Sequence, residues 1–277
     1  MKKILKIIIL SFLLGGCSQI KWAYRFSDWF IQSRLESFFD LQGEQVKRLE
    51  SSLKDYKNWH RKQMLPKYSK FLRKVKKNLG VRPWDVEKVR EVRKEVEKLG
   101  EETAVPWVKV SLEIYLSLSP DQIVHYKKKV KERDQKRLEK IKNSTPEKLS
   151  FERMEKTLDF LDVVLKKKQE LIFKKHFKEH PFPFTKSSER RTKWGEKTMT
   201  CLSDFSSKEK KAFCLKEHFM GWEKRRTQES KDYRLKMDEL FTKVINSFDE
   251  KQVSLLQDKL GEWSTDFADL SRLPPDE

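Results

Sequence analysis

Few residues of this chain have types and spacings that could do chemistry, and His60 is the first candidate. It lies on an apolar stripe of helical spacing, between Trp59 and Arg61. Beside a carboxylate such as Asp28 or Asp40, its imidazole would be a binding or catalytic group. A core imidazole that is hydrogen-bonded to a carboxylate or to a backbone carbonyl would show the same pattern. We therefore name Trp59, His60 and Arg61 as candidate binding residues, with the core interpretation as the alternative.

His176 and His180 are the second candidate, because residues four apart lie on one face of a helix. Two imidazoles at that spacing can share a metal ion. However, the chain lacks the H-E-x-x-H order of zinc proteases, and Pro181 directly follows the second histidine. We expect no metal site here.

Enzyme motifs are missing elsewhere in the sequence. It contains no G-x-S-x-G, no P-loop and no G-x-G-x-x-G, so no cofactor is expected. The 43 acidic residues still allow two carboxylates to meet in space, as glycan cleavage requires. An enzyme that acts on cell-wall glycan through paired carboxylates is therefore the alternative function.

Basic residues dominate the composition. The chain has 62 Lys and Arg against 43 Asp and Glu, for a formal net charge of +19, and lysines occur in runs at 127–129, 166–168 and 174–175. Pairs with glutamate four residues away would make such runs ordinary solvated helix faces. The excess leaves many cations unpaired, and their repulsion favours an anionic partner. Lys127, Lys128 and Lys129 are therefore predicted binding residues.

The N-terminal residues have the composition of an export signal. Three lysines lie near the start, and an apolar run from Ile4 to Leu14 follows that is too short for a permanent membrane span. The next residues, Gly15 and Gly16, are small and lead directly to Cys17.

The segment Leu14-Gly15-Gly16-Cys17 resembles the lipobox of bacterial lipoproteins. The resemblance implies that residues 1–16 are a signal peptide and that Cys17 carries a lipid anchor that includes palmitate. Ser18 follows instead of Asp, which by the sorting rule of Gram-negative lipoproteins implies the outer membrane, facing the periplasm. An ordinary signal peptide or an anchor helix with a chance cysteine is the alternative.

Cys201 and Cys214 remain as a possible pair. An exported protein folds in an oxidising compartment, where an even number of cysteines tends to pair. A helix–turn–helix between them could bring the two Cα atoms within the roughly 7 Å that a disulfide requires. We predict this disulfide, with two buried free thiols as the alternative.

Long helices are the predicted architecture, because the chain has only 8 Gly and 9 Pro and is rich in Lys, Glu and Leu. Apolar residues recur every three or four positions. We expect an all-α protein of long, kinked, antiparallel helices in an extended bundle. The predicted helices cover 20–39, 44–79 with a kink or split at Pro66, 86–118, 120–142, 149–177, 189–202, 208–233 and 250–270.

The clearest break after Cys17 is the segment His180-Pro181-Phe182-Pro183-Phe184. It is the predicted boundary between an N-terminal helical half, 17–180, and a C-terminal helical half, 181–277. The first helix, 20–39, is apolar around much of its circumference. We expect it to be buried against the next helices, with a position on the membrane surface as the alternative.

Three predicted helix starts, at 41–45, 118–122 and 248–252, share an apolar residue followed four positions later by glutamine. Ser119 and Asp249 are the expected N-caps of the last two. The pattern is similar to the L-T-x-x-Q motif of small, helical, basic periplasmic chaperones, which implies a chaperone-like cradle. Three capped helix starts would give the same pattern without that function.

Residues 12–72 are similar to one family of Gram-negative lipoproteins that is defined by a domain of unknown function. The shared elements include the lipobox, Trp59-His60-Arg61 and Leu65-Pro66-x-Tyr68. The family is all-helical and carries no established activity. The resemblance therefore implies a fold and a membrane address but no mechanism.

These observations predict a lipid-anchored binding protein of the bacterial envelope that uses basic and apolar helix surfaces. A chaperone-like activity is one form that this binding could take. Its expected partners are the membrane, through the anchor, and an anionic envelope component or a client protein. Nucleic acid would suit the charge but not an exported protein, so it is not an expected partner.

Overall fold

The computed structural model describes residues 19–203, 207–221 and 227–274 of the 277-residue chain. Every regular element in these residues is an α-helix, which confirms the predicted all-α fold. None of the described helices is long and apolar enough to cross a membrane. The helices are α2 (Gln19–Arg25), α3 (Ser27–Phe39), α4 (Glu44–Gln63), α5 (Leu65–Leu79), α6 (Val86–Ser117), α7 (Pro120–Lys142), α8 (Pro146–Phe160), α9 (Lys167–Glu179), α10 (Phe184–Ser203), α11 (Lys208–Met220), α12 (Gln228–Ser247) and α13 (Glu250–Arg272).

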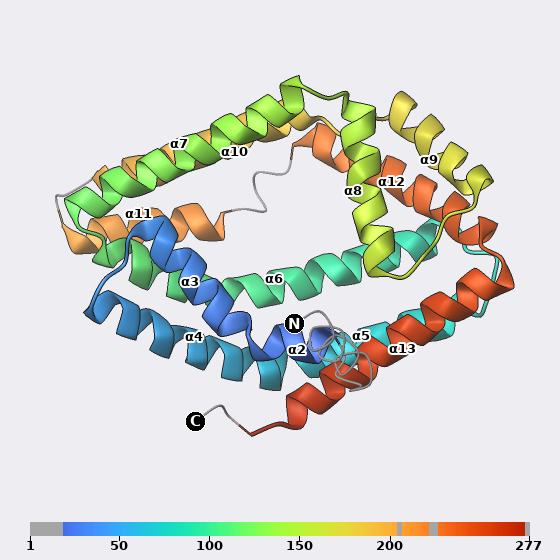
Figure 1. The fold of residues 1–277 in the computed structure, drawn as a ribbon, viewed down its shortest axis with the longest axis horizontal. Coiled ribbons are helices and arrows are strands. Elements are labelled where there is room, and N and C mark those ends of the chain that lie inside the picture. Colours follow the sequence, from blue (N-terminus) through green and yellow to red (C-terminus); the bar gives the residue numbers. More distant parts are fainter. Residues whose placement is uncertain (1–18, 204–206, 222–226, 275–277) are drawn as a thin grey trace, which may run out of the picture.

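The helices are arranged around a ring, as Figure 1 shows. α5 lies along α13, and α7 lies along α10. α4 contacts α3 and α6, while α9 contacts α8 and α12. α2 also contacts α13, so the first and last described helices meet. The ring is therefore closed by a packing contact between segments that are far apart in the sequence.

The buried apolar side chains form two cores. One lies between α3, α4, α6, α7, α10 and α11, and the other between α5, α8, α9, α12, α13 and the first turns of α6. α6 connects them, because it contributes Val89 to one core and Ile114 to the other. Each core contains residues from both sides of position 180, so the predicted boundary there does not coincide with the separation of the cores.

Helix ends follow the local sequence where its signals are strong. Pro66 splits the helix predicted over 44–79 into α4 and α5, because proline has no N–H group to continue the backbone bonds. Ser119 and Asp249 cap α7 and α13 as predicted, each by accepting a hydrogen bond from the backbone N–H three residues later.

Three predicted helices are wrong because each is interrupted. The helix predicted over 20–39 is divided at Phe26 into α2 and α3. The helix predicted over 149–177 is divided into α8 and α9, and Asp162 between them has a left-handed φ of 55°. The helix predicted over 208–233 is divided into α11 and α12, and the Thr227 side chain caps the second. Between α8 and α9 the apolar stripe of helical spacing continues across the break, so spacing alone does not reveal it.

The expected burial of residues 20–39 is confirmed on one side of α2 and α3 only. Leu35 and Phe39 on that side pack into the core. Four residues on the other side, which we call the aromatic face, are exposed: Trp22, Phe26, Trp29 and Phe30.

Four helix starts are joined in pairs by glutamine side chains. In the first pair, Gln45 Nε2 donates to Gln122 Oε1 at 2.9 Å, and Gln122 Nε2 donates to Gln45 Oε1 at 2.7 Å. Each amide also donates across the pair to a backbone carbonyl, that of Ser117 for Gln45 and that of Asp40 for Gln122. We call this arrangement a glutamine clasp.

A second glutamine clasp repeats the same hydrogen bonds. Gln169 and Gln252 bond reciprocally at 2.9 Å and donate to the carbonyls of Ser247 and Val164, respectively. Three of the four helix starts are those at 41–45, 118–122 and 248–252, which share the apolar-to-glutamine pattern. The fourth, at 165–169, has the same spacing and contains the lysine run 166–168. Because the glutamines bond one another, the pattern that resembles the chaperone motif serves here to join helix starts.

Candidate functional site

His60 lies in an aromatic cluster where α2, α4, α5 and α6 meet. Its Nδ1 is 3.2 Å from the Tyr24 hydroxyl, and its Nε2 is 3.4 Å from the Tyr68 hydroxyl. Tyr68 is in turn hydrogen-bonded to the hydroxyl of Thr103 on α6. The imidazole therefore has hydroxyl partners on both sides, instead of the carboxylate or carbonyl expected from the sequence.

The neighbours of His60 are also occupied by packing. Burial lowers the pKa of His60 from 6.5 to about 4, so the imidazole is neutral at pH 7. Arg61 is 3% exposed and donates to the carbonyl of Pro274, and the Trp59 ring packs 5.6 Å from that of Tyr56. These contacts support the core interpretation of Trp59, His60 and Arg61 and give no support to a binding role.

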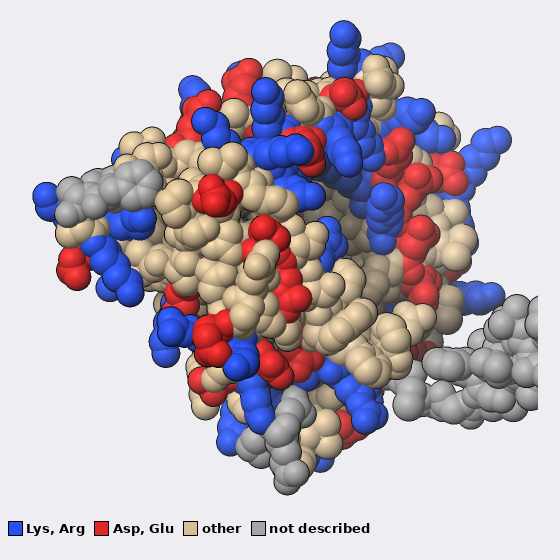
Figure 2. All heavy atoms as spheres, turned by 60° about the vertical axis from the view of Figure 1, so that its left-hand side comes forward, with Lys and Arg blue, Asp and Glu red and all other residues tan. Residues whose placement is uncertain are grey.

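The second predicted binding group, Lys127, Lys128 and Lys129, lies on the first turns of α7. Within the described residues none of the three has an ion-pair partner, and Lys127 and Lys128 are exposed. Figure 2 shows Lys and Arg side chains gathered over the upper part of one face of the molecule. A cavity between α7, α8 and the start of α10 lies further along the same helix, and these lysines do not line it.

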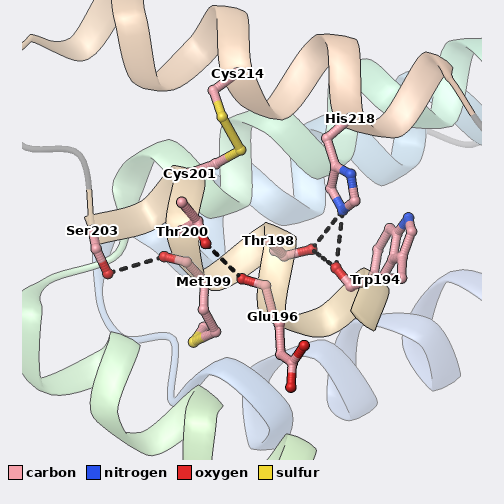
Figure 3. Close-up of a disulfide and its surroundings, with 9 residues drawn as sticks. All are labelled: Trp194, Glu196, Thr198, Met199, Thr200, Cys201, Ser203, Cys214 and His218. Carbon is pink, nitrogen blue, oxygen red and sulfur yellow. Dashed lines mark hydrogen bonds between the residues drawn. A yellow bond between two sulfur atoms is a disulfide. The ribbon is translucent and has the colours of Figure 1, made fainter. Parts of the chain in front are cut away.

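The predicted disulfide joins Cys201 on α10 to Cys214 on α11, with an S–S distance of 2.05 Å and a Cα–Cα distance of 5.5 Å (Figure 3). Cys201 is fully buried. One turn along, His218 Nε2 lies 3.0 Å from both the Thr198 hydroxyl and the carbonyl of Trp194. The bridge and this histidine fix α11 to α10.

His176 and His180 lie together at the end of α9, with ring centroids 5.1 Å apart. Burial is the main cause that lowers the pKa of His176 to about 4, and the positive charges of the nearby His180 and Lys243 lower it further. Over the described part of the chain, no group of three or more His, Cys, Asp or Glu side chains is arranged so that it could hold a metal ion.

The best candidate site is a cavity of about 330 Å³ between α7, α8 and the start of α10. This volume is at the lower end of the range for small-ligand sites. Six cationic side chains and one carboxylate, Glu152, line it together with apolar residues. The cations are Lys136, Arg137 and Lys140 from α7, Arg153 and Lys156 from α8, and Arg191 from α10.

Several of these cations have no carboxylate to neutralise them. Among the described residues Lys136, Lys156 and Arg191 form no ion pair, while Lys140 lies 3.4 Å from Glu152. The guanidinium of Arg153 lies over the Phe182 and Phe184 rings, 5.0 and 4.3 Å from their centroids.

The pKa of Arg153 indicates that the cavity is electrostatically positive. Burial and the positive charge of Arg191 lower the pKa of Arg153 below its usual value. An anion placed between these guanidiniums would relieve their repulsion. The cavity is therefore suited to a ligand with a negative group and an apolar part.

The elements around the cavity are positioned by local signals. The Thr145 side chain caps α8, and the N–H of Phe182 donates to the Ser150 hydroxyl, which ties the segment before α10 to α8. On the α7 side, Arg137 Nε donates to the Ser188 hydroxyl at 3.0 Å. Phe184 is buried beneath these groups.

None of the cavity residues is among the predicted site residues. The Pro-Phe-Pro-Phe segment predicts a boundary, but its two aromatic residues, Phe182 and Phe184, are also costly to leave exposed. A second available signal is that Lys136, Arg137 and Lys140 share one face of α7. What the sequence does not contain is the contact of that face with α8 and α10.

Cys17 and the lipobox lie outside the described residues, as does the whole segment before α2.

The fold and the cavity define an all-α protein with a closed ring of helices, a disulfide and a basic surface site. The chain belongs to a family of unknown function, DUF6279, which matches residues 37–234. That range includes Trp59-His60-Arg61 and every residue of the cavity, and the match agrees with the expectation of an uncharacterised helical domain. No curated protein and no solved structure matches the chain.

Proposed function

We propose that the chain is a lipid-anchored binding protein of the bacterial envelope, and that it holds an anionic, partly apolar ligand between α7, α8 and α10. The observation that carries the proposal is the excess of six cations over one carboxylate around the Phe182 and Phe184 rings. Attachment through Cys17 and a location at the periplasmic face of the outer membrane are part of the proposal and rest on the sequence pattern of residues 14–18.

The alternative, a glycan-cleaving enzyme, needs two carboxylates on opposite sides of a bound sugar. The neighbouring cavity between α8 and α9 contains three glutamates, Glu147, Glu152 and Glu155, but all three come from α8. Carboxylates from one wall do not flank a substrate, so this cavity lacks the arrangement that cleavage needs. Asp55 of α4 and Glu113 of α6, which line a further cavity together, are the pair that the enzyme alternative would use.

The chaperone-like variant needs exposed groups for a client. The glutamines of the clasps bond one another and are not available for that role. An acidic apolar segment of a client protein would still suit the basic cavity, so a client remains one of the proposed ligands.

The test uses dihexanoyl phosphatidic acid, which has a phosphate monoester and short acyl chains, titrated into the purified chain in a calorimeter. We expect binding that weakens as salt rises, because added ions screen exposed charges over about 10 Å. Dihexanoyl phosphatidylcholine, which is zwitterionic and has no net charge, should bind much more weakly. An acidic apolar peptide in place of the lipid tests the client form.

Two triple variants of equal charge change locate the binding. Arg153→Gln, Lys156→Gln and Arg191→Gln together should weaken binding by about tenfold or more, equivalent to about 1.4 kcal/mol. Lys127→Gln, Lys128→Gln and Lys129→Gln together should change it little, because these lysines do not line the cavity. Equal losses in the two triples, or a larger loss at 127–129, would assign the binding to general surface charge.

A further inference from the structure

The aromatic face of α2 and α3 is a surface that the rest of the protein leaves uncovered. Trp22, Phe26, Trp29 and Phe30 are 57%, 43%, 68% and 53% exposed. The rings of Trp22 and Phe26 are 5.2 Å apart, so the exposed area is continuous across the junction of the two helices. Contiguous apolar area of this kind marks an interaction site.

The opposite side of the same two helices is fixed to the ring. Lys21 Nζ lies 2.6 Å from an Asp269 carboxylate oxygen on α13, and the Tyr24 hydroxyl contacts His60 on α4. Asp28 pairs with the buried Lys57 at 3.0 Å. These contacts hold the aromatic face outward, so it cannot be explained as a helix that has simply detached.

The charges around the aromatic face are positive. Of the two acidic residues of α3, Asp28 pairs with Lys57, and Glu36, which keeps its charge and accepts a hydrogen bond from Gln32, lies six residues beyond Phe30 toward the other end of the helix. Arg25 is exposed beside the face, and the Arg34 guanidinium lies 5.5 Å from the Phe30 ring centroid. Arginine and tryptophan together suit the headgroup layer of an anionic membrane, where aromatic rings are enriched.

The position of the face in the chain identifies the occupant. Trp22 is five residues after Cys17, and five residues span at most about 17 Å. The apolar run of residues 4–14 directly precedes that cysteine. Any attachment of the chain at this point therefore brings α2 to the membrane surface, with the aromatic face as its apolar side.

We infer that the aromatic face docks into the interfacial layer of the membrane and holds the ring in one orientation. The inference rests on the proposed membrane attachment near Cys17 but not on the basic cavity. A lipid anchor alone would let the protein rotate freely, whereas anchor and aromatic rings together make two points of contact. Insertion of the rings would add to anchoring by removing apolar area from water.

The experiment uses the full, lipid-modified protein reconstituted into vesicles of phosphatidylethanolamine and phosphatidylglycerol. Ser33→Cys places a single thiol on the exposed side of α3, and Lys175→Cys places a control thiol on an exposed position of α9. Each carries a nitrobenzoxadiazole fluorophore, and nitroxide-labelled lipids are the quencher. We expect strong quenching and a blue shift at position 33 and neither at position 175.

A second variant replaces all four residues of the aromatic face by serine in the Ser33→Cys background. The replaced side chains are exposed, so the helix content measured by circular dichroism should stay the same. Quenching at position 33 should fall to the level of position 175 while the protein still floats with the vesicles. High salt should leave wild-type quenching largely in place, unlike binding in the basic cavity.

Equal quenching at positions 33 and 175, or quenching that survives the four serines, would overturn the inference. A wild-type dimer that the four serines convert to a monomer, with no quenching at position 33, would assign the face to a second copy instead. Protein that floats but is not quenched refutes docking alone. Protein that does not float with the vesicles refutes the attachment itself.

Discussion

A neutral, partly buried histidine makes stability depend on pH. The pKa of His60 is 6.5 in an unfolded chain and about 4 in the folded protein, because burial disfavours the charged ring. Between about pH 4 and pH 6.5 the unfolded state binds more protons than the folded state. The free energy of unfolding therefore rises as pH rises through that range, and it falls as pH falls. We expect a loss of about 1 kcal/mol between pH 7 and pH 5.5 from this residue.

Urea unfolding at several pH values tests this expectation. His60→Gln removes the titrating group, so its stability should change less between pH 7 and pH 5.5 than that of the wild type. His218→Gln is a comparison, because it removes another histidine outside the aromatic cluster. A pH dependence that is the same in wild type and His60→Gln would show that His60 is not held neutral by burial.

The disulfide between Cys201 and Cys214 closes a loop with a sequence separation of 13. In the chain-entropy account, such a loop stabilises the fold by about 3 kcal/mol. Reduction, or the pair Cys201→Ser and Cys214→Ser, should lower the thermal midpoint accordingly. Thiol quantification under denaturant without reductant should find neither cysteine reactive, and two reactive thiols would contradict the bridge.

At the scale of elements, the two glutamine clasps make different predictions because their burial differs. Gln169 is 2% exposed, whereas Gln45 is only partly buried. Gln169→Glu keeps the shape of the side chain. It replaces the Nε2 amide group, which donates to the Ser247 carbonyl, by a carboxylate oxygen that cannot donate. It should cost about 2 kcal/mol or more of unfolding free energy.

The same replacement elsewhere supplies the controls. Gln45→Glu should cost less, because water can reach its side chain, and Gln135→Glu on an exposed position of α7 should cost almost nothing. Urea denaturation at pH 7 measures all three. If Gln169→Glu were as stable as Gln135→Glu, the clasp would not contribute to stability.

The clasps also show where prediction from sequence succeeds and fails. The caps Ser119 and Asp249 are local, because each side chain bonds a backbone group three residues away. The start of α9, after the break at Asp162, is held in part by Gln169, which bonds Gln252, 83 residues later in the chain. A pairing over that distance leaves only a faint local sign, the apolar-to-glutamine spacing of 165–169.

At the scale of the whole molecule, the basic cavity could not be predicted from the sequence for the same reason. All-helical structure follows from the apolar periodicity of each segment, and the prediction was confirmed. The cavity instead needs Lys136, Arg153 and Arg191 to meet, and these lie on three helices. The lysine runs are conspicuous in the sequence, but nearness along the chain says little about which cations surround a cavity.

The whole molecule is expected to leave the membrane fraction when Cys17 is changed to alanine. In the proposed attachment the acyl chains on Cys17 are the principal anchor, and a single weak interfacial contact would not replace them. Cell fractionation and palmitate labelling measure both consequences. Label that persists in Cys17→Ala, or an unchanged membrane fraction, would contradict the lipobox assignment.

The contact between Lys21 on α2 and Asp269 on α13 joins positions that are 248 residues apart. The ring closes there, because α2 and α13 lie against one another. A circular permutant with a linker between the present ends and new termini between Asn143 and Ser144 would keep every helix pair. Under the proposed export and membrane attachment, the present order would place the signal first and put the helix that meets the lipid directly after it.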